Sequence, residues 1–365
     1  MTSGAILVAL DVAPDRNGVA TYWGDLAQLL ERRGVSMRLL CAAREAHAPR
    51  FVSPKTLFHL PLLGDHTQAI SFPSPYSVTA LIHALEPSLI VVPTPGPIGL
   101  LAARAAQREL VPCIACVHTD FSALVPGLFS PAVRWMLARP LAALETFVVR
   151  RAAVVAAPAG AHARRVAERF GVTVHEVASP LSPEFSDVPP AKPPSAVRRV
   201  LFAGRLSAEK NLGALLDAAR VHYDLEFMVV GDGPARQRLQ RTASANVRFQ
   251  PWQTRRDLRG ILDDCDVVVL PSTVESFGIA ALEAMARQRV VISSAASGIS
   301  GVLRDGDNGC VLPGDVALHE RLGDVRRLPA CELGAIGLRA RQTALEYSER
   351  CVSEWHQLVS AHSRD

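Results

Sequence analysis

The chain has 365 residues, 49% of them apolar and 20% charged, which is the composition of a soluble globular protein and too long a chain for a single compact core. Its formal net charge of +4 is compatible with an anionic substrate or an anionic membrane surface, but it is too mild to indicate nucleic-acid binding. Seven cysteines, an odd number scattered among apolar segments, indicate reduced thiols in a cytoplasmic protein.

The first half of the chain alternates short apolar runs with helical patterns. The segment Met1–Leu10 has no basic n-region and its apolar run stops at Asp11, so it predicts a buried strand and not a signal peptide. No stretch approaches the roughly eighteen apolar residues that span a bilayer, so we expect a cytoplasmic protein. Strands are predicted over Ala5–Leu10, Ser36–Cys41, Leu89–Val92, Ile114–Val117 and Ala153–Ala157, and helices over Ala20–Arg33, Ser77–Leu85, Gly99–Glu109, Ala132–Arg150 and Ala161–Phe170.

A proline-rich segment, Ser186–Ala196, interrupts this alternation and predicts a linker. The alternation then restarts, with strands predicted over Arg199–Ala203, Glu226–Val230, Val247–Gln250, Val267–Leu270, Val290–Ser293 and Gly309–Leu312. We therefore predict an α/β protein of two Rossmann-like, doubly wound domains facing across a cleft. The predicted boundaries are an N-terminal domain over 1–187, a linker over 188–196, a C-terminal domain over 197–340, and a helix over 341–365 that can cross back to the N-terminal domain.

Two carboxylates, Glu275 and Glu283, lie eight positions apart around a predicted strand-to-helix corner, where Ser276 can cap the helix Gly278–Arg287. This helix is apolar nearly all round, so a carboxylate on it needs hydrogen-bond donors or a counter-charge. A ribose diol would be one such partner for Glu283, and the hydroxyls of a hexose would suit Glu275. The alternative is structural: a salt bridge from Glu283 to Arg287 at i+4, with Glu275 favoured at the helix start by the dipole.

Two cations, Arg205 and Lys210, surround the predicted start of the helix Asn211–Arg220, just after Gly204 at the end of a strand. Cations oppose the dipole at a helix N-terminus, and a bound anion between them would reverse that effect. The pattern favours a diphosphate site. The alternative is that both cations pair with Glu209 or with solvent.

Weaker signals come from single residues at predicted strand ends. Gly231 opens a tight turn, Trp252 could line a base pocket, and His118 follows the strand that ends at Val117. Each is compatible with ordinary packing. The loop that contains Gly18 is not a GxGxxG dinucleotide fingerprint.

A zinc site is not expected at the CxxC spacing of Cys113 and Cys116, because the sequence offers no second pair and no nearby pair of histidines. No Ser-His-Asp or Cys-His arrangement is legible either.

Taken together, the chain resembles the retaining GT-B glycosyltransferases of family 4, which include bacterial mannosyl- and glycolipid glycosyltransferases. The resemblance covers about residues 4–315 and is collinear. Its landmarks are Asn17-Gly-Val19, His118-Thr-Asp-Phe121, Gly204-Arg205, Lys210-Asn211, Gly231-Asp-Gly-Pro234, Pro271-Ser272, Glu275, Glu283 and Asp305-Gly-Asp-Asn-Gly309.

The resemblance implies transfer of a hexose from a UDP- or GDP-sugar to an acceptor hydroxyl, with no cofactor, no metal and no nucleic acid. It implies that Arg205 and Lys210 neutralise the diphosphate, that Glu283 holds the ribose and that Glu275 contacts the donor sugar. It further implies that Gly18 approaches the diphosphate and that His118 lies near the reacting centre. The backbone of Ser276, Phe277 and Gly278 would lie beside the sugar and phosphate.

Two features modify this expectation. Where many relatives have Gly-Gly-x-x-Glu, this chain has Ser297 and Gly301 at the first glycine and the acid, so contacts of that loop to the nucleotide are in question. The basic, partly aromatic stretch Ala132–Arg151 could lie on an anionic membrane, as suits a lipid or cell-envelope glycan acceptor, or it could be an internal helix with solvated arginines.

Two other functions fit the same pattern. One is a sugar-nucleotide epimerase or a phosphorylase. An epimerase would convert the donor in the absence of an acceptor, and a phosphorylase would require a lysine-bound pyridoxal cofactor. The other is a non-catalytic relative that binds nucleotide sugars.

Overall fold

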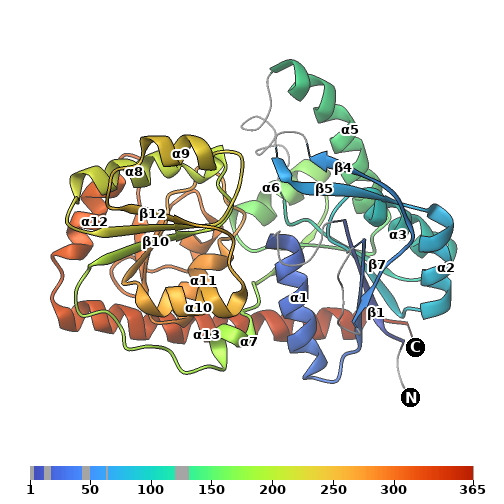
Figure 1. Ribbon diagram of the computed structural model, residues 1–365. Coiled ribbons are helices and arrows are strands. Elements are labelled where there is room, and N and C mark those ends of the chain that lie inside the picture. The colour runs from blue at the N-terminus through green and yellow to red at the C-terminus, as the bar shows by residue number, and fades with distance from the viewer. Residues whose placement is uncertain (1–3, 12–17, 43–49, 63–64, 120–130, 365) are drawn as a thin grey trace. The chain divides into compact units, whose positions relative to one another are not determined.

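The computed structural model describes residues 4–11, 18–42, 50–62, 65–119 and 131–364 of the chain (Figure 1). Side chains of residues 61, 62, 65–68, 131–137 and 161 are outside this description. The chain divides into two compact units, one of Met1–Pro180 with Glu349–Asp365 and one of Leu181–Ser348. Each unit is described by itself below.

The first unit is built on a parallel sheet in the order β3-β2-β1-β6-β7-β8-β9. Its strands are β1 (Ile6–Leu10), β2 (Met37–Cys41), β3 (Phe51–Val52), β6 (Leu89–Val92), β7 (Cys113–Cys116), β8 (Val154–Pro158) and β9 (Val174–Val177). Its helices are α1 (Gly18–Glu31), α2 (Pro75–Leu85), α3 (Pro97–Arg108), α5 (Pro131–Val149) and α6 (Ala161–Phe170). A separate antiparallel ribbon joins β4 (Thr56–Leu62) to β5 (Asp65–Pro73).

The second unit has a parallel sheet in the order β12-β11-β10-β13-β14-β15. Its strands are β10 (Arg199–Ala203), β11 (Glu226–Val230), β12 (Val247–Gln250), β13 (Val267–Leu270), β14 (Val290–Ser294) and β15 (Cys310–Leu312). Its helices are α7 (Pro183–Ser186), η1 (Ala208–Lys210), α8 (Leu212–Val221), α9 (Arg236–Thr242), α10 (Arg255–Asp264), α11 (Ile279–Ala286), η2 (Gly298–Gly301) and α12 (Leu318–Arg326). The last helix, α13 (Ala330–His362), begins in this unit, and its residues from Glu349 onward belong to the first unit. In Figure 1 this sheet lies between α8 and α9 on one side and α10 and α11 on the other.

Helices on both faces explain the composition of the central strands. β13 reads Val-Val-Val-Leu and is buried along its whole length, as a strand covered on both faces must be. In each sheet the chain leaves two adjacent central strands in opposite directions: β1 and β6 in the first unit, β10 and β13 in the second. Ligands of open α/β sheets bind beyond the carboxyl ends of the strands at this switch point. The loops after β10 and β13 carry Arg205 and Glu275, so the fold brings the two predicted donor-binding segments to one edge.

Several local expectations differ from the structure. Ser276 does not cap α11; the residue before the helix is Gly278, with φ 104°, and no side chain caps it. Asn211 does not begin a helix but lies in the left-handed region, with φ 51°, between η1 and α8. The ribbon β4–β5 and strands β3 and β9 were not predicted.

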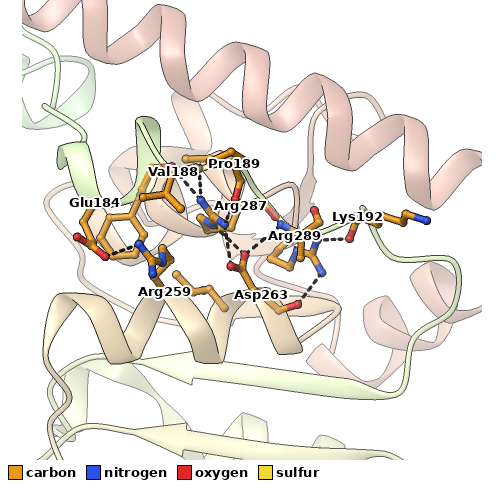
Figure 2. A network of polar contacts seen from close by, with 12 residues as sticks. Glu184, Val188, Pro189, Lys192, Arg259, Asp263, Arg287 and Arg289 are labelled. Atoms are coloured by element: carbon orange, nitrogen blue, oxygen red, sulfur yellow. Dashed lines mark hydrogen bonds and ion pairs between the residues drawn. The ribbon is translucent and has the colours of Figure 1, made fainter.

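The proline-rich segment is held on the second unit by buried arginines (Figure 2). Arg287, which is fully buried, donates two hydrogen bonds to the Asp263 carboxylate, at 2.8 and 2.7 Å, and others to the carbonyls of Val188 (2.6 Å) and Pro189 (2.7 Å). Arg289 donates to the carbonyl of Lys192. Because prolines donate no backbone hydrogen bonds, this segment is fixed through its carbonyls instead.

No helix in the described part of the chain is both long enough and apolar enough to cross a membrane.

Candidate active site

The centre of the candidate site is an ion pair between Lys210 and Glu275. Lys210 ends η1, after β10, and Glu275 lies in the loop after β13. The Lys210 Nζ donates to Glu275 Oε2 at 2.5 Å, and their side chains are only 16% and 19% exposed. A backbone bond of 2.8 Å from Thr273 N to Glu209 O ties the two loops together. The expected alternative partner of Lys210, Glu209, instead accepts a hydrogen bond from Ser207.

Arg205 and Gly204 are partly buried at the same edge, directly after β10. A cation here is five residues from Lys210 and belongs to the same loop. The described residues therefore place Arg205, Lys210 and Glu275 on the two loops that flank the switch point of the second sheet.

Glu283 is buried, with its side chain 4% exposed, and it pairs with Arg255 at the start of α10. The salt bridge to Arg287 that the i+4 spacing suggested is absent from the described residues, since the Arg287 guanidinium bonds Asp263. Arg255 also lies over the Phe185 ring, at 5.4 Å from the centroid. The buried carboxylate thus has its counter-charge from another helix, and a carboxylate has further acceptor positions beyond the one that Arg255 occupies.

Gly231 has a structural reason to be glycine. Its φ is 138°, and a Cβ there would lie 1.9 Å from the Gly204 carbonyl oxygen. The loop after β11 is bonded to the loop after β10, with Leu206 N donating to Asp232 O at 2.8 Å. Gly231 therefore allows the loop after β11 to pack closely against the loop after β10, which carries Arg205.

Ser297, which stands where many relatives have glycine, is bonded to the loop after β13 that carries Glu275. Ser297 Oγ donates to the Phe277 carbonyl at 3.0 Å, and Gly298 N donates to the Glu275 carbonyl at 3.1 Å. A Cβ at Gly298 would lie 2.1 Å from the Ser276 carbonyl oxygen. The loop 297–301 thus holds the backbone of Glu275–Gly278 through these two hydrogen bonds, and a Cβ at Gly301 would meet nothing within 4 Å.

Two other predicted residues have different surroundings. The Phe277 ring is buried and stacks on Tyr347, with centroids 5.3 Å apart, so the ring is a packing group of the second unit. Trp252, in the loop after β12, is 43% exposed. In the landmark Asp305–Gly309, Asn308 is fully buried and its side chain accepts from Arg304 N at 2.6 Å, which makes that landmark a structural turn.

In the first unit, His118 follows β7 and is 6% exposed. Its Nε2 accepts a hydrogen bond from Trp23 Nε1 at 3.0 Å, and Cys116 Sγ lies 3.2 Å from the same nitrogen. Burial, with a smaller contribution from the charge of His162, lowers the pKa of His118 to about 3. Gly18 begins α1 and has open space around it, whereas Asn17 and residues 120–121 of the two neighbouring landmarks lie outside the described residues.

Asp11 was not predicted as a site residue. It directly follows β1 and accepts hydrogen bonds from Thr94 Oγ1 (2.6 Å) and from the backbone of Gly96 (3.0 Å) and Ile98 (2.6 Å) at the start of α3. Burial nevertheless raises its pKa to about 6. The sequence signal that could have drawn attention to Asp11 is a carboxyl group directly after the apolar run of the first strand.

The stretch Ala132–Arg151 covers all of helix α5 except its first residue, Pro131. Arg151 lies over the Phe147 ring at 3.5 Å and donates to Gln107 Oε1 at 3.1 Å. Arg139 and Arg150 are exposed. Among the described residues no group of three or more His, Cys, Asp or Glu side chains could hold a metal ion.

Comparison with known proteins defines the class first. The structure matches HepE of Anabaena in complex with UDP-glucose, with a TM-score of 0.74 and 19% identity over 98% of this chain and 100% of that one. It also matches sucrose-phosphate synthase of Thermosynechococcus elongatus, with a TM-score of 0.72 and 17% identity over 98% of both chains. These likenesses show the fold, and together with the two Rossmann-like units they confirm the predicted GT-B fold class.

Family models and relatives then narrow the class. The model described as Glycosyltransferase Family 4 matches residues 16–178, and the one described as Glycosyl transferases group 1 matches residues 197–324. Alpha-D-kanosaminyltransferase of Streptomyces kanamyceticus is 27% identical over 56% of this chain and 58% of that protein. D-inositol 3-phosphate glycosyltransferase of Mycolicibacterium paratuberculosis is 32% identical over 41% of this chain and 36% of that protein, so less than two thirds of either relative is matched. With one model on each side of the proline-rich segment, the chain belongs to glycosyltransferase family 4.

Proposed function

We propose that the protein is a retaining glycosyltransferase that moves a hexose from a UDP- or GDP-sugar to an acceptor hydroxyl. The observation that carries the proposal is the Lys210–Glu275 pair on the two loops at the switch point of the second sheet. A cation beside a carboxylate can bind a donor in two parts, with the ammonium on the diphosphate and the carboxylate on the sugar hydroxyls. The family and the UDP-glucose complex of the similar HepE support the same class of donor.

In the proposed site, Arg205 and Lys210 neutralise the diphosphate and the charge that develops as it leaves. Preorganised cations in a partly buried loop do this without the reorganisation that water would need. Glu283, paired with Arg255, accepts hydrogen bonds from the ribose hydroxyls, and Glu275 binds hydroxyls of the hexose. Two cations would supply the charge that a metal supplies in other transferases.

The chemistry retains the anomeric configuration. The bond from the anomeric carbon to the phosphate oxygen breaks as an oxocarbenium-like centre forms, and the acceptor oxygen attacks from the face that the nucleotide leaves. The acceptor proton passes to an oxygen of the departing diphosphate. Neither glutamate then acts as the acid or base of a glycosidase pair.

The acceptor is proposed to be a hydroxyl of a small molecule, a lipid or a cell-envelope glycan. Relatives named for small cyclitol or phosphoinositide chemistry are among the similar proteins. If the acceptor is a lipid, α5 and the adjoining Arg150 and Arg151 are the proposed contact with an anionic bilayer. Co-sedimentation with vesicles that contain or lack phosphatidylglycerol tests this contact.

The donor is tested first by thermal shift with UDP, GDP and ADP and their common hexose derivatives. A ligand at a hundred times its dissociation constant should stabilise the fold by about 2.7 kcal/mol. Donor cleavage with and without candidate acceptors then separates transfer from epimerisation and from binding alone. If no nucleotide sugar binds or turns over, the proposal fails.

Variants locate the site. Lys210→Ala should weaken nucleotide diphosphate binding and lower kcat/KM by about a hundredfold, since it removes a preorganised charge. Lys55→Ala removes an exposed lysine of the other unit and should leave both unchanged. Glu275→Gln keeps the shape of the side chain and should lower turnover more than nucleotide affinity. Equal losses of turnover and of UDP or GDP affinity would contradict the assignment of Glu275 to the sugar.

A further inference from the structure

The edge of a buried tryptophan is directed at His118. Trp23 lies on α1 with no exposed surface, and its indole Nε1 donates to His118 Nε2 at 3.0 Å. The rings are nearly perpendicular, at 89°. Since α1 and the loop after β7 belong to the first unit, this contact is internal to that unit.

The direction of this hydrogen bond is fixed by chemistry. An indole N–H can only donate, so His118 Nε2 must be the acceptor. A neutral imidazole carries its single proton on the nitrogen that does not accept, which here is Nδ1. The neutral form is the one present above pH 4, because burial lowers the pKa of His118 to about 3.

The flipped His118 ring would not be equivalent, because it would lose the bond from Trp23. The ring centroids of Tyr22 and His118 are 4.5 Å apart, and those of Trp23 and Trp355 are 4.8 Å apart. The Cys116 thiol, whose pKa is raised by burial, lies 3.2 Å from the same Nε2 and keeps its proton. Turning the ring over would place a carbon opposite the indole N–H and lose the bond.

The second nitrogen has a different environment. Nδ1 has no hydrogen-bond partner among the described residues. It is also not among the side-chain atoms that are both fully buried and unbonded, so some of its surface is accessible. His118 also borders a cavity of about 20 Å³, shared with Thr94 and Thr119, which has room for one water-sized group. A single hydroxyl oxygen would fit there.

We propose that Trp23 is a positioning residue that holds His118 as the Nδ1–H tautomer, so that His118 presents a hydrogen-bond donor to an oxygen of the sugar substrate and cannot act as a base through Nε2. The ligand group must then offer a lone pair, as a hydroxyl or a carboxylate does and an ammonium does not. The assignment of that oxygen to a sugar rests on the proposed function; the tautomer does not.

The tautomer is read directly from nitrogen–proton correlation spectra of protein labelled with ¹⁵N-histidine. The chain has 11 histidines, and the signals of His118 are identified by their loss in His118→Gln. Wild-type His118 should show a protonated Nδ1 and an unprotonated Nε2. A protonated Nε2 in the wild type would overturn the proposal.

A matched pair of variants separates the hydrogen bond from packing. Trp23→Phe removes the donor to His118, whereas Trp355→Phe removes the same atoms from a fully buried neighbouring indole whose N–H donates to Tyr22 at 2.6 Å. Trp23→Phe should move the His118 proton toward Nε2, and Trp355→Phe should leave it on Nδ1. If both variants changed the His118 signals alike, Trp23 would be a packing residue only.

Kinetics give the second readout. With a donor that the wild type turns over, Trp23→Phe should lower kcat about tenfold with little change in KM, and Trp355→Phe should lower it less than twofold. Equal losses in the two variants would overturn the positioning role. If the wild type turns over no nucleotide sugar, the proposed function fails, while the spectra still decide the tautomer.

Discussion

Replacing Arg287 with methionine should destabilise the second unit strongly, because this fully buried guanidinium has four good acceptors. Methionine keeps much of the volume but leaves the Asp263 carboxylate and the Val188 and Pro189 carbonyls without their donor. Removing one partner of a buried ion pair costs about 3–5 kcal/mol. The Asp263 side chain is 23% exposed, so water can solvate it in part, and about 3 kcal/mol is the expected loss.

The assay is urea unfolding followed by a probe of the second unit. With a slope of about 2 kcal/mol per molar urea, a loss of about 3 kcal/mol lowers the midpoint by about 1.5 M. Hydrogen exchange of peptides covering residues 183–197 should accelerate in the same variant, since their carbonyl anchors are gone. The control is Arg327→Met, which breaks an ion pair to Asp324 whose side chains are 74% and 53% exposed and should cost less than about 1 kcal/mol.

Equal midpoints for Arg287→Met and Arg327→Met would refute the reasoning. So would a large loss of stability with unchanged exchange in residues 183–197, because the arginine would then stabilise the unit without fixing this segment.

Three further predictions concern single residues. Burial raises the pKa of Asp11 from 3.8 to about 6, so the stability that its protonated form contributes is full below pH 3.8 and is lost as the pH rises to 6. The difference in unfolding free energy between wild type and Asp11→Asn, measured by urea unfolding, should therefore change by about 3 kcal/mol over this range. A difference that stays constant with pH would contradict the burial argument. Gly231→Ala should cost more than about 2 kcal/mol, because its Cβ would meet the Gly204 carbonyl, whereas Gly18→Ala should change the melting temperature little, and similar losses would count against the loop packing described. Glu283→Gln should abolish the preference for ribose over 2′-deoxyribose nucleotides in calorimetric titrations, and an unchanged preference would remove Glu283 from the ribose site.

Much of the second unit could be predicted from the sequence because its strands are buried on both faces. Continuous β-branched runs such as Val267–Leu270 leave no alternative to a central parallel strand, and the predicted bounds match the structure there. The ribbon β4–β5 was missed because Leu57, Phe58 and Leu60 are all exposed, so the strand lacks the alternation that one buried face imposes. Ser276 was chosen as a cap on its residue type, but Gly278 alone fits the left-handed backbone at that corner.

The candidate site divides in the same way. The residue types at Lys210 and Glu275 could be chosen from spacing and resemblance, but their pairing depends on the order of strands β10 and β13, which local patterns do not encode. Spacing suggested Arg287 as the partner of Glu283, whereas the partner is Arg255, 28 residues earlier on another helix. The Trp23–His118 bond, 95 residues apart, carries no local signal at all.

The anchoring of the proline-rich segment also decides where the second unit can be cut from the chain. A fragment that begins at residue 197, after the prolines, would keep Arg287 and Arg289 but lose the carbonyls of Val188, Pro189 and Lys192 that satisfy them. The guanidinium groups of Arg287 and Arg289 would then lack these carbonyl acceptors. A fragment that begins at Leu181 takes these acceptors with it, so an independently expressed second unit should start before the prolines and not after them.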